Sequence, residues 1–588
     1  MNTITQILSA HVSEAFRLLG YEQFGNVVLS NRPDLCQFQC DDAFKIAKIY
    51  KKNPLVIAQE VIPFLQENTQ IFKSVNVFAP GFINISLTDD FLAEFCLSMF
   101  NDENLGLPKN EKAETIILDY GGPNIAKPLH IGHLRSAIIG ESLKRLFKYY
   151  GCNVISDVHL GDWGLQMGLV IAEYQERYPN WDCFSNNFES AKNIVPEIDV
   201  NELNEVYPFA SEKSKKDEDF LNKAKKITFE LQNGNLGYLA LWEKIRNASV
   251  QDLTKIYKML SVDFDYWYGE SDAHNYINNL LQTLKQKNLL YKSEGALVVN
   301  VSKDDDKKTI PPVLIKKSDS SNLYATTDLA TIIQRQKDFN PDKILYVVDA
   351  RQDLHFEQVF RCARKANLVD NNTELEFLGF GTINGSDGKP YKTRDGGVMR
   401  LETFIETVKA ATAEQLEKSN YVSNISNMEK ESLSLKIAIA AIKFGDLINH
   451  YSKNYIFDSD KFLSFDGKTG TYLLYTISRI NSLLKKVDFD ITKDLSISCF
   501  DDEERNLVLN IINTGDVFLN AINNKSPNII CEHAYIVAAS FSKLYQSCNI
   551  LKEDDINRKN RLISLFILAK KFLTLYLDIL GIEPVEYM

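Results

Sequence analysis

The sequence predicts an α/β protein with a doubly wound central domain, preceded by a small α+β domain and followed by an α-helical bundle. The 588 residues are too many for one hydrophobic core, so about three or four domains are expected. Short β-branched runs alternate with helical patterns from about residue 113 to 400, which is typical of a parallel sheet covered by helices. After that, apolar residues recur at helical spacing almost to the last residue. We therefore divide the chain into residues 1–110, 111–405 and 406–588.

The first domain combines helices with a small sheet. Residues 43–48 predict a helix that follows an earlier one near the N-terminus. Two β-rich runs follow at 72–77 and 81–87, and the Ala-Pro-Gly step at 79–81 is a turn signal. The charged stretch at 101–112 predicts a linker to the central domain.

The central domain begins with an apolar run at 115–118 that predicts a buried strand, and β-branched runs recur at 153–158 and 343–348. In doubly wound sheets, ligands bind beyond the carboxyl ends of the strands. Between about 176 and 240 lies a polar insertion, whose residues 211–219 predict a solvated helical surface, and we assign it no function. The helix expected after the first strand is indicated by Ile139, Leu143, Leu146, Phe147 and Tyr150.

A His-Ile-Gly-His tetrad, residues 130–133, lies where the first central strand turns into its helix. Free backbone N–H groups and the helix dipole attract phosphate at such a position. Gly132 leaves room for a ligand against the backbone, and two imidazoles one turn apart can donate hydrogen bonds to the phosphates of a nucleotide. The tetrad alone fits equally well with two histidines that satisfy their neighbours at a helix start.

Composition narrows the class of protein. Hydrophobic content of 45% and charged content of 24% are ordinary for a globular chain. No apolar run approaches the roughly 18 residues that span a bilayer, and no signal-peptide pattern is present. The nine cysteines form no CxxC pair, which indicates reduced thiols in a cytosolic protein. A net charge of −12 argues against a general nucleic-acid binder, although local basic patches can still carry phosphate contacts.

The segment from Asn124 to Ser136 resembles the signature of class I arginyl-tRNA synthetases, which share the HIGH tetrad on a Rossmann-like fold. Further segments resemble motifs of this family in the same order along the chain. They are residues 159–166, 323–328, 351–355, 388–397 at the place of the KMSKS loop, and 464–475 at the start of a DALR-type anticodon-binding domain. The resemblance implies a Rossmann-like catalytic domain, an N-terminal domain that binds the tRNA elbow, and a C-terminal anticodon-binding bundle.

The resemblance implies an enzyme that activates L-arginine with ATP and transfers the arginyl group to the 3′ end of tRNA(Arg). Catalysis of this kind is mostly positioning and stabilisation of charge on phosphate. His130 and His133 would donate to the phosphates, and Lys392 and Arg394 would hold the β- and γ-phosphates. The first lysine of a standard KMSKS loop is missing, and Lys127 is expected to compensate. The expected ATP-binding residues are Pro123, His130, Gly132, His133, Lys392, Thr393 and Arg394.

By the same resemblance, Asp119 and Asp328 would bind the guanidinium group of the substrate. Many relatives carry Glu at the position of Asp119. Asn124 and Gln352 are expected at the α-amino end. Taken singly, Asp328 fits a helix cap better than a ligand, and Tyr324 a core aromatic, but the joint match of all these residues to the family positions reverses this. The full expected arginine-binding set is Asp119, Gly122, Asn124, His133, Tyr324, Asp328 and Gln352.

The resemblance also implies contacts with tRNA. Aromatic side chains can stack on unpaired bases, although the two tyrosines near residue 475 fit a core equally well. Asp41 stands where the family has Asn, and Thr471, Leu474 and Ile477 stand where relatives often carry Pro, Gln and His. Members of the family generally need bound tRNA before they activate arginine, and we expect the same here. The expected tRNA contacts are Gln39, Tyr472, Tyr475, Arg479, Tyr587 and Met588.

Mg²⁺ that accompanies ATP is the only metal expected, and the chain is expected to act as a cytoplasmic monomer without a membrane partner.

Three other functions remain open. A small-molecule nucleotidyltransferase would share the HIGH-type fold but not the helical last third. A non-catalytic tRNA-binding paralogue would have lost the tetrad or the 388–397 loop. A sister synthetase for cysteine or methionine would show a zinc pattern and lack the acidic pocket residues.

Overall fold

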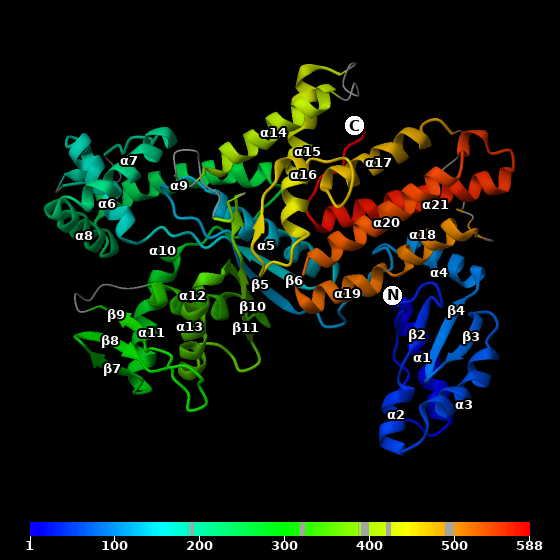
Figure 1. Cartoon of the computed structure of the whole chain (residues 1–588). Helices are drawn as coiled ribbons and strands as arrows, with labels where there is room; N and C mark the ends of the chain where they lie inside the picture. Colours follow the sequence, from blue (N-terminus) through cyan, green and yellow to red (C-terminus); the bar gives the residue numbers. More distant parts are fainter. Residues whose placement is uncertain are drawn as a thin grey trace.

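The sheet at the centre of the molecule has four parallel strands in the order β11-β10-β5-β6 (Figure 1). The computed structural model describes residues 1–185, 187–189, 193–317, 324–385, 387–389, 399–418, 425–487, 495, 497 and 500–588. The strands are β5 (Thr115–Tyr120), β6 (Asn153–Asp157), β10 (Lys343–Asp349) and β11 (Glu374–Phe380). The three strands predicted from β-branched runs are confirmed.

The connections of this sheet place a crevice beside β5 and β10. Helix α5 (Ile131–Tyr149) leads from β5 to its neighbour β6, and α13 (Asp353–Ala366) leads from β10 to β11 on the other side. The chain therefore winds in opposite directions from the two central strands, and the crevice between their carboxyl ends is the switch point where ligands bind. Residues 116–118 of β5 are fully buried because helices cover both faces of a parallel sheet. The doubly wound prediction is confirmed.

The N-terminal part is an α+β domain with an antiparallel sheet in the order β1-β2-β4-β3. The two predicted β-runs become β3 (Phe72–Phe78) and β4 (Phe82–Leu87), and the predicted helix becomes α2 (Ala43–Tyr50). Strands β1 (Val27–Leu29) and β2 (Phe38–Cys40) are too short to show a sequence pattern. The other helices are α1 (Ile4–Leu18), α3 (Pro54–Gln66) and α4 (Asp89–Asn101).

The polar insertion is a folded cluster of helices. A solvated surface was predicted for residues 211–219: Glu212 and residues 215–219 are exposed, whereas residues 211, 213 and 214 are half-buried. Leu203, Val206 and Phe220 on the same helices are almost fully buried, because an amphipathic helix buries one stripe against its neighbours. The helices are α6 (Leu165–Arg177), α7 (Val200–Ser214), α8 (Glu218–Gln232) and α9 (Leu236–Met259) (Figure 1).

A further unit between the insertion and β10 carries a small antiparallel sheet in the order β7-β8-β9. Helix α12 (Tyr324–Phe339) then leads into β10. The remaining elements of this unit are α10 (Glu270–Ala273), α11 (Ile277–Gln286), β7 (Leu290–Ser293), β8 (Ala296–Val299) and β9 (Val313–Lys316).

The last part of the chain is helical, as predicted. Before the bundle, β12 (Ile383–Asn384) pairs in parallel with β13 (Tyr455–Ile456). A buried ion pair joins this part to the central domain: Arg135 Nε of α5 lies 3.0 Å from Asp446 Oδ2. The helices are α14 (Leu401–Lys418), α15 (Asn427–Leu447), α16 (Ser459–Phe462), α17 (Gly470–Leu484), α18 (Asp502–Ile512), α19 (Thr514–Asn524), α20 (Asn528–Ser547) and α21 (Ile556–Ile579).

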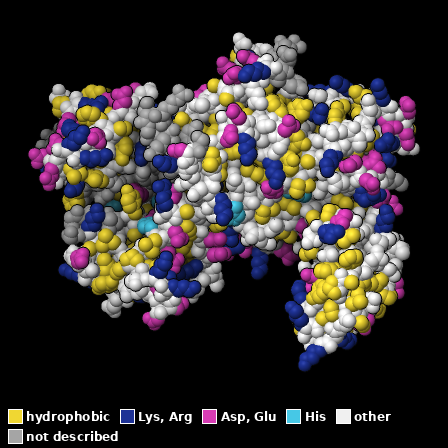
Figure 2. Space-filling view, in the orientation of Figure 1, with side chains coloured by type: hydrophobic (Ala, Val, Ile, Leu, Met, Phe, Trp, Pro, Cys, Tyr) yellow, Lys and Arg dark blue, Asp and Glu magenta, His cyan; other side chains and the backbone are white. Residues whose placement is uncertain are grey.

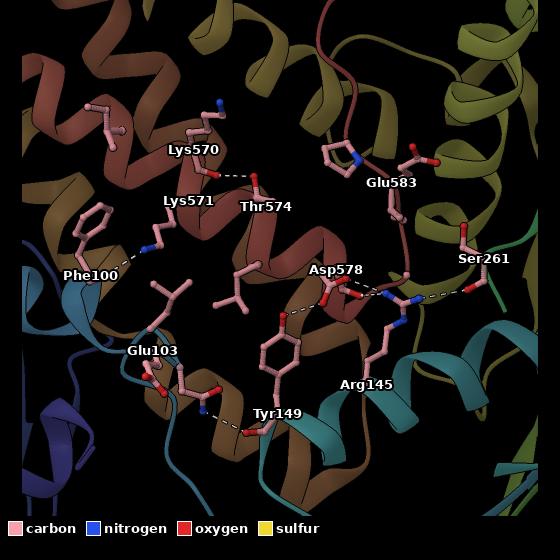
Figure 3. Close-up of a pocket in the computed structure, with 17 residues that line it drawn as sticks. Phe100, Glu103, Arg145, Tyr149, Ser261, Lys570, Lys571, Thr574, Asp578 and Glu583 are labelled. Atoms are coloured by element: carbon pink, nitrogen blue, oxygen red, sulfur yellow. Dashed lines mark hydrogen bonds and ion pairs between the residues drawn. The ribbon is translucent and has the colours of Figure 1, made fainter. Parts of the chain in front are cut away.

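A cavity of about 710 Å³ lies where the end of α4, helix α5 and helix α21 meet. Figure 3 shows Arg145 and Tyr149 of α5 pointing toward Asp578 of α21. The guanidinium Nη1 of Arg145 donates to Asp578 Oδ1 over 2.9 Å, and the Tyr149 hydroxyl donates to Oδ2 over 2.7 Å. Lys571 lies 4.2 Å from the ring centre of Phe100. The far end of α5 is therefore joined to the bundle by charged hydrogen bonds.

The thiols agree with the expectation of reduced cysteines. Eight cysteines lie in the described part of the chain, and all eight are free. Seven of them are buried. Across the described residues, none of the helices combines the length and apolarity that crossing a membrane requires.

Candidate active site

The tetrad begins helix α5, with His130 as its N-cap residue. The ring Nδ1 of His130 accepts a hydrogen bond from Gly132 N over 3.0 Å, and Nδ1 of His133 accepts one from His130 N over 3.1 Å. A neutral imidazole that accepts at Nδ1 carries its proton on Nε2. The backbone therefore sets the tautomer of both rings and leaves each Nε2–H as a donor for a ligand at the helix start.

Both histidines are neutral at pH 7. Burial lowers the pKa of His133 to about 3, with smaller contributions from the charges of His130 and Lys127. Burial also lowers the pKa of His130, followed by the charges of Lys127 and Arg351. The ring centres lie 3.9 Å apart. The pair supplies directed hydrogen bonds to phosphate oxygens, while positive charge has to come from neighbouring side chains.

The chain around the KMSKS-like loop returns to the tetrad. Ile131 N donates to Met399 O over 3.0 Å, and Leu401 N donates to Leu129 O over 2.9 Å. These two bonds join one end of the loop to the residues around His130. Lys392, Thr393 and Arg394, predicted to hold ATP, lie outside the described residues.

A hollow of about 400 Å³ opens beside the tetrad. Lys127, His130 and Arg400 line it, together with Tyr207 and Pro208 of α7. Helix α7 of the polar insertion, to which we assigned no function, therefore lies next to the tetrad.

Helix α12 carries two of the predicted arginine-binding residues. Tyr324 is its first residue and is 72% exposed, and Asp328 lies one turn later. Asp328 Oδ2 is 2.6 Å from Nε2 of His355 on α13. Since Asp328 is the fifth residue of the helix, it is not the N-cap. Gln352, expected at the α-amino end, is the exposed N-cap residue of α13.

Asp119, at the end of β5, is already paired inside the protein. Its Oδ2 accepts a hydrogen bond from Arg335 Nη2 over 2.7 Å, and the same nitrogen donates to Asp157 Oδ2 over 2.7 Å. All three side chains are almost fully buried. The carboxylate that we expected to bind the substrate's guanidinium thus already binds a guanidinium of the chain itself.

Glu270, which we did not single out from the sequence, joins this pocket as the first residue of α10. Burial raises its pKa to about 7, the charge of His159 opposes that shift, and Asp162 and Asp328 add to it. Helix α10 packs against α12, which carries Tyr324 and Asp328, so Glu270 lies beside these two residues. A single Glu after Gly269 has no spacing pattern, and only the folded chain brings it beside Asp328.

The loop between β5 and α5 rests on the segment that follows β6. Ile125 N donates to Gly161 O over 3.1 Å, and Gly161 N donates to Pro123 O over 3.0 Å. A Cβ atom at position 161 would lie 2.0 Å from the side-chain oxygen of Asn124, so any other residue there would displace the Asn124 side chain. Gly122 has a φ of +43°, in the left-handed region. These contacts hold Asn124 at the carboxyl end of β5.

Several predicted tRNA contacts gather on α17. The guanidinium of Arg479 lies 5.4 Å from the ring centre of Tyr475 and 4.4 Å from that of Tyr545. The Tyr472 hydroxyl lies 2.9 Å from Ser542 Oγ, so this side chain is tied to α20. Asn481 donates to Glu586 O over 3.2 Å, which brings the chain end beside α17.

The last two residues of the chain, both predicted tRNA contacts, differ in exposure. Tyr587 is 42% exposed, whereas Met588 is buried. The three positions that depart from the family pattern point into the core, because their side chains are at most 1% exposed: Thr471, Leu474 and Ile477. In the N-terminal domain, Gln39 donates to Asn84 Oδ1 over 2.8 Å and is half-buried, and Asp41 is exposed.

The surface shows no single large basic field on the face in Figure 2, where Lys and Arg side chains are interspersed with Asp and Glu. This agrees with the overall negative charge. Among the described residues, no three or more His, Cys, Asp or Glu side chains gather in a group that could hold a metal ion.

Comparison with known proteins finds arginyl-tRNA synthetase domains along almost the whole chain. Family models match in order: the arginyl tRNA synthetase N terminal domain at residues 2–87, the catalytic domain of class I (R) tRNA synthetases at 97–459, and the DALR anticodon binding domain at 473–588. Proteins named arginine–tRNA ligase from Alkaliphilus oremlandii and Agathobacter rectalis are each 46% identical, with 100% of both chains covered. The solved arginyl-tRNA synthetase of Plasmodium falciparum has a TM-score of 0.82 at 26% identity, and that of Thermus thermophilus has 0.80 at 20%, both over 100% of each chain.

Proposed function

Because the chain belongs to the arginyl-tRNA synthetase family, we propose that it is an arginine–tRNA ligase, which activates L-arginine with ATP and transfers it to the 3′ end of tRNA(Arg). One observation supports this most. Two neutral histidine donors lie at the start of α5, and two carboxylates, Glu270 and Asp328, lie on the adjoining helices α10 and α12. The first suits a nucleotide phosphate and the second a guanidinium group.

In the first step, a carboxylate oxygen of arginine attacks the α-phosphorus of ATP, and the bond to the β-phosphate breaks so that pyrophosphate leaves. The Nε2–H groups of His130 and His133 would donate to the phosphates as charge builds on their oxygens. Lys127 lines the adjacent hollow and would supply positive charge. Lys392, Thr393 and Arg394 would close over the β- and γ-phosphates, and Pro123 and Gly132 would border the nucleotide. In the second step, a hydroxyl of the terminal ribose attacks the arginyl carbonyl, and AMP leaves.

Arginine would bind with its guanidinium between Glu270 and Asp328, beside the Tyr324 ring. Neither carboxylate meets a Lys or Arg side chain among the described residues, so a bound guanidinium would be their charge partner. Asn124 and Gln352 would hold the α-amino end, near Gly122 and His133. Asp119 would act from beneath the pocket, through its pairing with Arg335. A site that leaves its carboxylates unpaired with any other amino acid discriminates strongly without editing.

The tRNA would lie along the bundle and the N-terminal domain. Tyr475, Arg479 and Tyr587 are proposed as anticodon contacts, together with Tyr472 and Met588 as their support, and Gln39 as an elbow contact. We propose that tRNA must bind before arginine is activated, that Mg²⁺ enters bound to the phosphates of ATP, and that the enzyme works as a cytoplasmic monomer.

The test is ATP–pyrophosphate exchange with each amino acid, with and without total tRNA. The expected result is exchange with arginine only, and only when tRNA is present. Lys127→Ala should lose most of this activity. Exchange with a different amino acid would move the chain to a sister synthetase, and no exchange under any condition would leave only a tRNA-binding role. Exchange at full rate without tRNA would overturn the tRNA requirement alone.

A further inference from the structure

Arg335 is a fully buried charge beneath the arginine pocket that the proposed reaction does not use. It lies on α12 and is 1% exposed. Asp328 on the same helix is seven residues earlier, which places the two side chains on one face of the helix. Arg335 therefore lies two turns below the residue proposed to bind the substrate.

One nitrogen of Arg335 makes both of its ion pairs. Nη2 is 2.7 Å from Asp119 Oδ2 and 2.7 Å from Asp157 Oδ2, and the guanidinium carbon lies 5.4 Å from the ring centre of Tyr346. An arginine stays charged at any physiological pH, so this cluster sets two carboxyl groups against one permanent positive charge. We call Asp119, Asp157 and Arg335 the closed cluster.

The closed cluster joins three elements that carry proposed substrate contacts. Asp119 ends β5 and starts the loop with Asn124 and the tetrad. Asp157 ends β6 and starts the segment that includes Gly161, against which the Asn124 side chain packs. Arg335 itself is on α12 with Asp328. One guanidinium thus holds together the α-amino end and the guanidinium end of the pocket.

The closed cluster also sets the charge that the substrate meets. Burial raises the pKa of Asp119, and the charge of Arg335 is the largest effect that opposes it. Without Arg335, Asp119 and Asp157 would lie close to each other without a cation, beside the helix that carries Asp328. Repulsion between carboxylates that share a site favours protonation of some of them, which would weaken the binding of a cationic side chain.

From these contacts we propose that Arg335 is a positioning and specificity-determining residue for arginine: a built-in guanidinium that pairs with both Asp119 and Asp157, so that Glu270 and Asp328 are the carboxylates left for the substrate. This proposal rests on the proposed function. It explains why the guanidinium of Arg335 lies beneath a pocket that binds the guanidinium of the substrate. Arg335 pairs with Asp119 and Asp157, the two carboxylates that the substrate does not reach.

The test compares Arg335→Gln, Arg335→Lys and Arg361→Gln in the full-length enzyme. Arg361, on α13, pairs with Asp306 and Glu357 away from the pocket, so it is a matched control for the loss of a two-carboxylate arginine. We expect Arg335→Gln to raise the KM for arginine by about tenfold to 100-fold, the range for a charged hydrogen bond, and to change the KM for ATP by less than about threefold. Arg335→Lys should restore much of the affinity, because one nitrogen already makes both bonds. Arg361→Gln should leave both KM values unchanged.

Three results would overturn the proposal: an unchanged KM for arginine in Arg335→Gln, an equal rise in both KM values, or a lysine variant no better than the glutamine variant. If Arg335→Gln does not fold, Asp157→Asn takes its place, since it removes one partner of Arg335 and should raise the KM for arginine selectively. An unchanged KM there would count against the proposal equally. Failure of the proposed function is separate, because it would appear as no arginine-dependent exchange by the unaltered enzyme.

Discussion

Two groups of carboxylates in one crevice have different environments. In the closed cluster, Asp119 and Asp157 both pair with one nitrogen of Arg335, so the chain itself supplies their cation. Glu270 and Asp328, which we call the open pair, have no Lys or Arg partner among the described residues, and burial raises the pKa of Glu270 to about 7. Both groups consist of carboxylates, and Asp328 of the open pair meets the imidazole of His355 rather than a guanidinium. The difference is whether the chain supplies the compensating cation, and a carboxylate for which it does not is the better candidate for ligand binding.

The largest expected effect is on the stability of the closed cluster. Arg335→Gln should lower the free energy of unfolding by about 3–5 kcal/mol, because it leaves buried carboxylates without their cation. Urea denaturation of the variant and the unaltered chain would measure this. A loss below about 1 kcal/mol would mean that Asp119 and Asp157 do not depend on Arg335. The closed cluster would then not differ from the open pair in its need for a cation.

The open pair should behave in the opposite way. Glu270→Gln should raise the free energy of unfolding at pH 8 by up to about 3 kcal/mol, since the folded-state pKa of about 7 lies above the ordinary value of 4.5. The sign follows from proton binding: between these two values the unfolded carboxyl is charged and the folded one is neutral, so stability falls as the pH rises. Denaturation at pH 5 and pH 8 should show the gain at the higher pH only. Equal stability at both values would show that Glu270 carries no burial penalty.

Substitutions in the open pair should reduce activity strongly. Glu270→Gln and Asp328→Asn should each lower kcat/KM for arginine by about 100-fold, the upper range for a charge-assisted hydrogen bond, with little change in the KM for ATP. Glu357→Gln on α13 is a control with an exposed carboxylate. Steady-state exchange kinetics would measure all three, and a variant of the open pair with ordinary kcat/KM would exclude that residue from the site.

A smaller effect should follow pH. Protonation of Glu270 below about pH 7 removes one negative charge, so the KM for arginine should rise by up to about tenfold for each unit of pH below that value. Above pH 7 it should be level. Glu270→Gln should remove this dependence, and a slope that persists in the variant would assign it to a different group.

The smallest effect is expected at an exposed ion pair. Lys255 of α9 lies 3.3 Å from Glu402 of α14, and both side chains are at least half exposed. Solvent screens such pairs, so Lys255→Gln should change the free energy of unfolding by less than about 0.5 kcal/mol. A change above about 1 kcal/mol would show that ion pairs stabilise this chain whether or not they are buried.

Local pattern accounts for the parts of the site that follow one another in the chain. A buried strand, a tight connection and a helix place the two histidines at an anion-binding turn, and the structure has them there. The resemblance supplied Asp328 and Tyr324, which lie together on the first turns of α12. It also supplied Asp119 as a guanidinium ligand, which stays a prediction, and the structure pairs this residue with Arg335.

Amino-acid order thus determined the fold class, the strand-to-helix turn and the types of side chain available, because hydrophobic periodicity and turn residues act over a few positions. The distribution of charge in the crevice was decided by the tertiary structure. Glu270 and Asp328 are 58 residues apart in the chain, and Asp119 and Arg335 are 216 apart, so no local pattern records that one pair shares a site and the other an ion pair. The packing of β5, β6, α10 and α12 against one another determines which carboxylates pair with a guanidinium of the chain and which are left for a substrate.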